Sequence, residues 1–278
     1  MDYLASYDLE SLDACVKAGG AVAALHRELK LPATFFILGR CLEEHGKELR
    51  SSLDDELFDL QSHTYSHQVF RPLPDTGAAP DVDVAREIGL GVRWVRETFG
   101  RPCTGLRTGC GYDGGMKKLP HVLAACADAG LEYVSSDLRG PGDTLPSPLK
   151  RPYTYRDAGH AAIWELPVHG WHDNVLKGLC PRVGMVAYPP AEDWHLPPRA
   201  PKTPREHAEH HLLWVDKARE AGLPFVSFAF HPWSVFGYDP ELLELRLILE
   251  GCAERKVRVA TCTGAYLALR DAATGGAQ

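Results

Sequence analysis

Residues 57–67 read Leu-Phe-Asp-Leu-Gln-Ser-His-Thr-Tyr-Ser-His, a short apolar run followed by two histidines four positions apart. The apolar run predicts a strand. A single helical turn after it would let His63 and His67 face one point, and that point could hold a metal ion. Taken alone, the pair is also typical of two polar loop residues. The interpretation therefore depends on the rest of the chain.

Strand-like and helix-like patterns alternate along the whole sequence. We expect strands at 3–7, 32–39, 57–60, just before 105, and at 133–137, 161–168, 224–230 and 256–260. We expect helices at 11–29, 40–51, 83–99, 116–129, 203–221, 240–255 and 263–271. Such alternation implies a largely parallel sheet, open or closed into a barrel. We predict one α/β domain over residues 1–272, with a proline-rich insertion at 179–204 and a frayed end at 273–278.

Composition narrows the class of partner. The chain has 278 residues, of which 45% are hydrophobic, enough to bury a sizeable core. Thirty basic against 37 acidic residues give a net charge of −7, which argues against nucleic acid or an anionic membrane surface as a partner. Eight scattered cysteines without a CxxC pair indicate neither a thiolate zinc site nor a disulfide framework.

Polar groups with catalytic chemistry follow several of the predicted strands. Asp8 and Glu10 come after the first strand and share one face of an extended chain, although acids there would equally favour the start of the next helix. A glycine-dense turn at 105–112 could direct backbone N–H groups at an oxyanion. Asp137 and His231 end two later strands. In α/β barrels and open sheets, loops at the carboxyl ends of strands converge on the active site.

One further histidine pair has metal-like spacing. His207 and His211 lie four residues apart in the helix predicted at 203–221. Because the surrounding run is Glu-His-Ala-Glu-His-His, we interpret it as a solvated helix face.

The stretch Ala33-Thr34-Phe35-Phe36-Ile37-Leu38-Gly39, followed by the motif at 62–67, resembles the NodB-homology polysaccharide deacetylases, also called carbohydrate esterase family four. The resemblance extends through Arg107, Asp137 and His231. It implies a deformed (β/α) barrel of about seven strands with a groove and a divalent metal. Zn²⁺ is the expected ion, with Co²⁺, Mn²⁺ or Ni²⁺ as alternatives. The implied reaction is hydrolysis of an N-acetyl group.

The resemblance also implies roles for the acidic and histidine motifs. Asp8 matches the general base, and Glu10 with His63 and His67 match the metal ligands. The Asp-x-Glu form, in place of adjacent aspartates, resembles the divergent branch that includes intracellular deacetylases and allantoinase-like hydrolases of cyclic amides. His231 matches the histidine that acts as general acid.

Other positions match supporting residues of the family. Arg107 matches the arginine that supports the base, and Asp137 the acid that holds this arginine. Gly109 replaces a usual proline, and the backbone N–H of Cys110 is expected to help form the oxyanion hole. Three aromatic residues, Tyr112, Trp171 and Trp233, complete the predicted substrate contacts.

Three functions stay open from the sequence. They are a metal-dependent N-deacetylase of a sugar or sugar-containing small molecule, a hydrolase of a cyclic amide, imide or ureide, and a barrel that binds a ligand without catalysis. The N-terminus shows no signal-peptide pattern, so we expect a cytoplasmic protein. The insertion at 179–204 could then act as a lid that favours small N-acylated substrates. A homo-oligomer is compatible with the sequence.

Overall fold

The computed structural model describes residues 1–76, 81–145, 147–169, 173–176 and 201–275. Its strands are β1 (Asp2–Leu9), β2 (Ala33–Ile37), β3 (Phe58–Ser62), β4 (Gly105–Asp113), β5 (Tyr133–Arg139), β6 (Tyr153–Tyr155), β7 (His160–Glu165), β8 (Phe225–Phe230) and β9 (Arg258–Ala260). Its helices are α1 (Cys15–Leu29), α2 (Gly39–Leu53), α3 (Val84–Phe99), α4 (Pro120–Asp128), α5 (Asp173–Leu176), α6 (Pro204–Glu220), α7 (Pro232–Tyr238), α8 (Leu243–Glu254) and α9 (Cys262–Gly275), with two short 3₁₀ turns.

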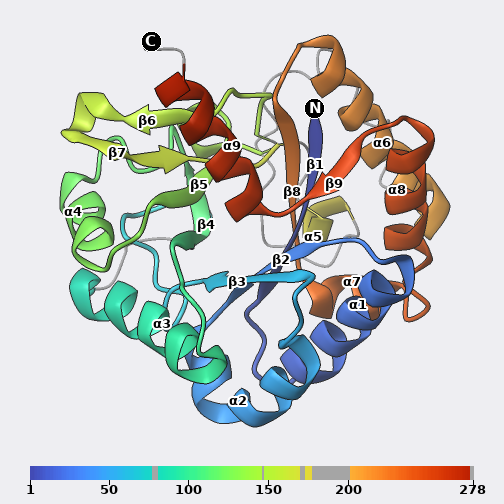
Figure 1. Ribbon diagram of the computed structural model, residues 1–278, viewed down its shortest axis with the longest axis horizontal. Helices are drawn as coiled ribbons and strands as arrows, with labels where there is room; N and C mark the ends of the chain where they lie inside the picture. Colours follow the sequence, from blue (N-terminus) through green and yellow to red (C-terminus); the bar gives the residue numbers. More distant parts are fainter. Residues whose placement is uncertain (77–80, 146, 170–172, 177–200, 276–278) are drawn as a thin grey trace.

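The strands form one sheet in the order β6-β7-β5-β4-β3-β2-β1-β8, and β9 pairs with β1. Every pairing is parallel except that of β6 with β7. The segment after β7 spans the gap to β8. Leu166 N–H donates to Val134 O on β5 at 2.8 Å, and His169 N–H donates to Ser227 O on β8 at 2.7 Å. With its ring of helices (Figure 1), the molecule has the predicted deformed-barrel architecture.

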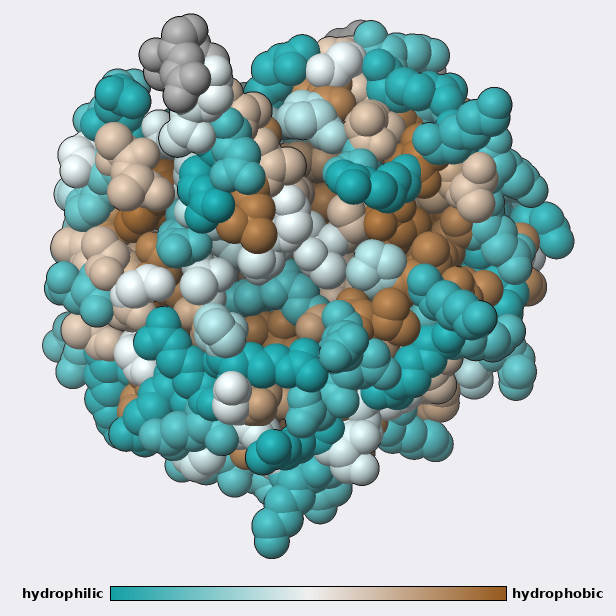
Figure 2. Space-filling view, viewed as in Figure 1, coloured by the Kyte–Doolittle hydropathy of each residue, from teal (hydrophilic) through white to brown (hydrophobic). Residues whose placement is uncertain are grey.

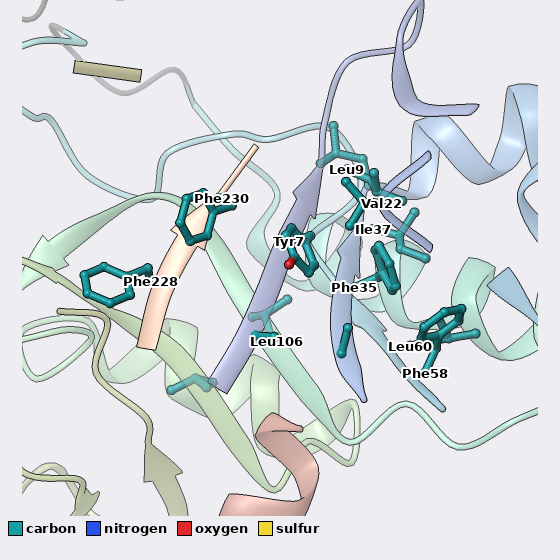
Figure 3. Close-up of a cluster of buried hydrophobic side chains, with 14 of the residues drawn as sticks. Tyr7, Leu9, Val22, Phe35, Ile37, Phe58, Leu60, Leu106, Phe228 and Phe230 are labelled. Atoms are coloured by element: carbon teal, nitrogen blue, oxygen red, sulfur yellow. The ribbon is translucent and has the colours of Figure 1, made fainter. Parts of the chain in front are cut away.

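Alternation along β1 decides which side chains face the barrel interior. Tyr3, Ala5, Tyr7 and Leu9 point outward into the core between sheet and helices. Figure 3 shows Tyr7 and Leu9 beside the outward side chains of β2. Successive strand residues face opposite sides, so Leu4, Ser6, Asp8 and then Glu10 point inward.

A second apolar cluster lies inside the barrel, mostly toward the amino-terminal ends of the strands. It is made of Leu4, Phe36, Tyr133, Leu166, Phe225, Cys262, Ala265 and Tyr266. Helix α9 covers this end of the barrel (Figure 1), and it is fixed there by the bond from Cys262 N–H to Thr34 Oγ1 at 2.8 Å. Asp8 and Glu10, the inward polar residues furthest along this stretch, therefore lie toward the opposite, carboxyl-terminal end.

The surface fits this layered arrangement. Figure 2 shows hydrophilic residues around the rim of one face and apolar residues gathered toward its middle and right. The most exposed large apolar side chains, Leu213, Leu243 and Leu267, lie on outer helices. Among the described helices, none combines the length and apolar character needed to cross a membrane.

Several local predictions are corrected. The predicted glycine-dense turn is part of β4, which carries a register shift between Arg107 and Tyr112. The helix predicted at 263–271 extends to Gly275. The solvated face predicted for α6 is wrong, because His207 and His211 are 1% and 0% exposed. The insertion at 179–204 lies almost wholly outside the described residues.

Two buried histidines should make stability depend on pH. Burial lowers the pKa of His26 and of His169 from 6.5 to about 4. A lowered folded pKa stabilises the fold above pH 6.5, and this contribution is lost as pH falls toward 4. Between pH 7.5 and 5, the titration of each histidine should lower the free energy of unfolding by about 2 kcal/mol.

Burial also raises the pKa of Glu165 to about 7, which stabilises the fold as pH falls and so offsets the effect of the histidines. The test therefore compares variants with the unchanged chain. His26→Gln can keep the partners Tyr7 Oη and Leu31 O without titrating. In urea unfolding, the free energy of unfolding of this variant should fall by about 2 kcal/mol less than that of the unchanged chain between pH 7.5 and 5. His121→Gln, on the exposed face of α4, is the control. Parallel pH profiles for all three proteins would contradict the prediction.

Candidate active site

Asp8 is held at the carboxyl end of β1 by a buried arginine. Arg107 Nη1 donates to Asp8 Oδ1 at 2.8 Å, and both side chains are almost fully buried. Arg107 Nη2 also donates to Ser6 Oγ at 2.9 Å, and the guanidinium lies 4.2 Å from the Phe36 ring centroid. The ion pair fixes one carboxylate oxygen of Asp8 and leaves Oδ2 4.0 Å from His63 Nε2.

Glu10 lies two residues further along, in contact with both histidines of the motif. Its Oε2 is 3.0 Å from His67 Nε2 and 3.5 Å from His63 Nε2. Burial raises the pKa of Glu10, but His231, His63 and His67 more than offset this and hold it well below the usual value. The predicted convergence of Glu10 with His63 and His67 is therefore present.

The histidines do not converge through a helical turn, as the sequence suggested. Thr64 and His67 have φ values of 67° and 65°, in the left-handed region, so the chain between them turns sharply. His67 N–H donates to Thr64 Oγ1 at 3.1 Å. Glu87 on α3 accepts from Ser66 N–H at 2.6 Å and from Ser66 Oγ. These bonds hold the loop that carries both imidazoles.

His231 stands across Glu10 at the end of β8. Its Nδ1 contacts Asp173 Oδ1 at 2.7 Å, and its Nε2 is 3.7 Å from Glu10 Oε1. Burial lowers the pKa of His231, but Glu10 and Asp173 outweigh it and raise this pKa to about 10. Trp233 Nε1 donates to Glu10 Oε1 at 3.1 Å, so the predicted contact residue lies at the site. An imidazolium here can offer a proton from Nε2.

The donor set fits a divalent metal. The ligand atoms of Glu10, His63 and His67 all lie within 4.8 Å of one another. His63 Nδ1 contacts Arg107 O at 3.0 Å, which fixes its proton on Nδ1 and leaves the Nε2 lone pair for a cation. That buried Nε2 has no hydrogen-bond partner within the described part of the chain. Two imidazoles and one carboxylate with a remaining open position are typical of catalytic zinc.

Gly109 and Cys110 lie in the irregular part of β4, and Gly109 lies beside His67. A Cβ atom at Gly109 would lie 3.0 Å from His67 Nδ1 and 3.1 Å from two ring carbons. Glycine in place of the family's usual proline therefore leaves room for the imidazole. Cys110 has φ 62°, and its carbonyl accepts from Arg139 Nε at 2.9 Å. The role of its N–H in an oxyanion hole stays a prediction.

Two predicted site residues have other contacts than expected, and a third lies outside the described residues. Asp137 does not hold Arg107. Its carboxylate accepts from Lys150, from Tyr153 Oη at 3.0 Å and from Gly114 N–H at 3.1 Å. Tyr112 is fully buried and its hydroxyl accepts from Phe70 N–H at 2.8 Å, so its side chain is a core residue. Trp171 is not among the described residues.

Sequence reasoning missed three positioning residues. Ser135 Oγ, rather than Asp137, accepts from Arg107 Nε and Nη2, both at 3.2 Å. Asp173 contacts His231, and Glu87 holds the histidine loop. For Asp173 a signal existed, since a carboxylate follows the predicted strand at 161–168 within a few residues. Ser135 and Glu87 had no comparable signal, because serine in a strand and glutamate in a helix are common.

Comparison with known proteins supports the assignment of the fold. The polysaccharide deacetylase family model matches residues 17–134, a stretch that contains His63, His67 and Arg107. Asp8, Glu10 and His231 lie outside it. No curated protein matches the chain.

Solved structures share the fold over nearly the whole chain. A protein of Mycobacterium smegmatis named as a candidate polysaccharide deacetylase is 20% identical, with 97% of this chain and 90% of that chain covered and a TM-score of 0.65. PuuE allantoinase is 15% identical, with 90% and 70% covered and a TM-score of 0.59. A pseudoenzyme of carbohydrate esterase family four from Bacillus anthracis is 10% identical, with 95% and 65% covered and a TM-score of 0.54.

The chain has an α/β fold that these solved structures share, and its histidine motif lies in the stretch that the polysaccharide deacetylase family model matches. The family match and the structural neighbours confirm the resemblance to the NodB-homology polysaccharide deacetylases. One fold serves proteins named as a deacetylase, an allantoinase and a pseudoenzyme. Function must therefore be argued from the residues of the site.

The fit of His67 against Gly109 gives a testable consequence. Gly109→Ala would place a methyl carbon 3.0 to 3.1 Å from atoms of the His67 ring, so the ring must shift slightly and divalent-metal affinity should fall by about 10-fold. Zinc competition with a chromophoric chelator measures this. Gly89→Ala, at a helical position with open space around it, is the matched control. Equal zinc affinity for both variants would show that the close approach of Gly109 to His67 has no effect on metal binding by His67.

Proposed function

We propose that this protein is a metal-dependent hydrolase that removes an N-acetyl group from an amino sugar or a sugar-containing small molecule. The observation that carries the proposal is the placement of Glu10. Its carboxylate touches the Nε2 atoms of His63 and His67 on one side and faces His231 on the other. Asp8 lies beside the same cluster, bound to Arg107. A metal-ligand triad thus stands between a candidate base and a candidate acid.

Asp8 acts as the general base in this proposal. Arg107 occupies its Oδ1, which leaves Oδ2 facing the triad. A carboxylate in this position can take a proton from a water molecule that attacks the amide carbonyl. A divalent cation held by Glu10, His63 and His67 would polarise that carbonyl and lower the pKa of water, from about 15.7 toward about 7.

His231 acts as the general acid. Its Nδ1 is engaged by Asp173, which orients the ring and leaves Nε2 toward the cluster. Expulsion of an amide anion from a tetrahedral intermediate is prohibitive, so the leaving nitrogen needs this proton. The backbone N–H of Cys110 would stabilise the oxyanion, a contact whose loss costs about 3 to 4 kcal/mol of barrier.

Acetate release tests the proposal. The untagged chain, loaded with Zn²⁺, should release acetate from N-acetylglucosamine or short N-acetylglucosamine oligomers. The double variant His63→Ala/His67→Ala should lose both the activity and one divalent metal ion per chain. His121→Ala, an exposed histidine on α4, controls for the loss of a histidine elsewhere. A metal content in the double variant equal to that of the unchanged chain, or acetate release that survives the double substitution, would remove the function from this site.

A second candidate is hydrolysis of a cyclic amide, imide or ureide. The Asp-x-Glu spacing of Asp8 and Glu10 and the structural likeness to PuuE allantoinase favour it. The same base, metal ligands and acid would open a ring without releasing acetate. Ring opening of allantoin or a cyclic imide, without acetate from N-acetyl sugars, would select this candidate. Absence of both activities in the metal-loaded chain would favour a catalytically inactive binding barrel.

A further inference from the structure

A second cluster of metal-ligating side chains lies away from the active site. His207 and His211 are on α6, and Glu244 is in the first turn of α8. Their ligand atoms all lie within 4.8 Å of one another. All three side chains are buried, with exposures of 1%, 0% and 0%. Residues four apart on a helix share a face, so both imidazoles can approach one point from α6.

This cluster lies on the outer side of the barrel wall. The His211 ring packs against Phe228 and Phe230, at centroid distances of 4.6 and 4.9 Å. Both phenylalanines belong to the core between the sheet and the helices, and Figure 3 shows them along β8. The active-site carboxylates lie on the inner side of the same wall. The two clusters are therefore separate sites.

Glu244 places a carboxylate in the buried interface between α6 and α8. A carboxylate transferred into an apolar interior needs a compensating charge and hydrogen bonds. His207 Nδ1 contacts Glu244 Oε1 at 2.5 Å, so one protonated imidazole could supply that charge. A proton-sharing pair of this kind needs a single imidazole. The structure brings a second one, His211, to the same point, with the His207 and His211 rings 4.7 Å apart.

We propose that His207, His211 and Glu244 form a second zinc-binding site, which links α6 to α8. Two imidazole nitrogens and a carboxylate oxygen are ligands that Zn²⁺ prefers, at about 2.0 to 2.2 Å. Zinc would replace the close His207–Glu244 contact, and modest side-chain shifts would bring the three ligand atoms to bonding distance. The metal would neutralise the buried carboxylate and join two helices that pack on the same part of the barrel.

The neighbouring histidine provides an internal comparison. His210 lies on the same helix and is also buried, at 5% exposure. Its Nε2 accepts from Trp214 Nε1 at 3.3 Å, and burial lowers its pKa to about 4. It is not part of the described ligand cluster. Its substitution therefore removes a buried imidazole from α6 without removing a proposed ligand.

The test counts zinc in a protein that lacks the first site. The untagged full chain carrying His63→Ala/His67→Ala is purified with added zinc, and its zinc content is measured by mass spectrometry. We expect about one zinc ion per chain. The further change His211→Gln should remove it, and His210→Gln should not. Because zinc binds the folded state, its removal by a chelator should lower the Tm in all but the His211→Gln protein.

A second measurement needs no substitution in the buried cluster. Anomalous diffraction at the zinc edge from crystals of the unchanged chain should show a peak among His207, His211 and Glu244. The proposal fails if the His63→Ala/His67→Ala protein is zinc-free and the peak is absent, and the cluster is then a buried ion pair only. If His211→Gln does not fold, the zinc content of the parent protein and the anomalous peak still decide. Neither measurement depends on catalytic activity.

Discussion

Asp8→Asn is expected to lower the kcat for amide hydrolysis by about 10²-fold or more while the divalent-metal content stays unchanged. Asparagine keeps the size of the side chain and can still accept from Arg107, so the local fold should survive. It cannot take a proton from water, because the amide lacks a basic oxygen. The zinc content and the kcat of the same preparation, measured side by side, give the result.

Glu10→Gln should show the reverse order of effects. The Glu10 carboxylate contacts His63 and His67, and its loss removes the anionic ligand of the triad. Zinc affinity should therefore fall first, and activity should return in part at high zinc concentration. Asp2→Asn is the matched control, since Asp2 lies at the start of β1, the strand that Glu10 follows, and pairs with Arg258. Metal loss in Asp8→Asn with retention in Glu10→Gln would reverse the two assignments.

The inward position of this acidic pair was predictable because strand alternation is a local property. Residues 8 and 10 share a face in any extended chain. The apolar composition of the runs that form β2, β3 and β8 likewise predicted these strands. Since parallel strands end at a common edge, placing His63, His67 and His231 near one another followed from the topology.

The remaining parts of the site depend on tertiary contacts that leave no local pattern. The left-handed turns at Thr64 and His67 are held by Glu87, a residue on the next helix. Asp137 lies two residues beyond Ser135 on β5, and the structure uses the serine for Arg107 while the carboxylate binds Lys150. The polar composition of α6 led to the wrong prediction of a solvated face. His207 and His211 instead meet Glu244 across a helix interface that the sequence does not reveal.

Replacement of the His231 imidazole should affect substrates according to their leaving groups. His231→Ala should slow hydrolysis of an N-acetyl amide by about 10² to 10⁴-fold, because the leaving amine must receive a proton. An activated acetate ester such as 4-nitrophenyl acetate leaves as a stable anion, so its hydrolysis should fall far less. The ratio of kcat/KM for the two substrates isolates proton donation from metal binding.

Asp173→Asn tests the same acid through the residue that positions it. The Asp173 carboxylate contacts His231 Nδ1 at 2.7 Å and helps to raise the His231 pKa. Without that charge the imidazolium is less stable, so the pKa falls and the alkaline limb of the amide pH–rate profile should move to lower pH. Asp143→Asn, at another partly buried carboxylate that pairs with Arg71, should leave the limb in place. Equal losses on amide and ester in His231→Ala, together with an unmoved limb in Asp173→Asn, would remove the acid role from His231.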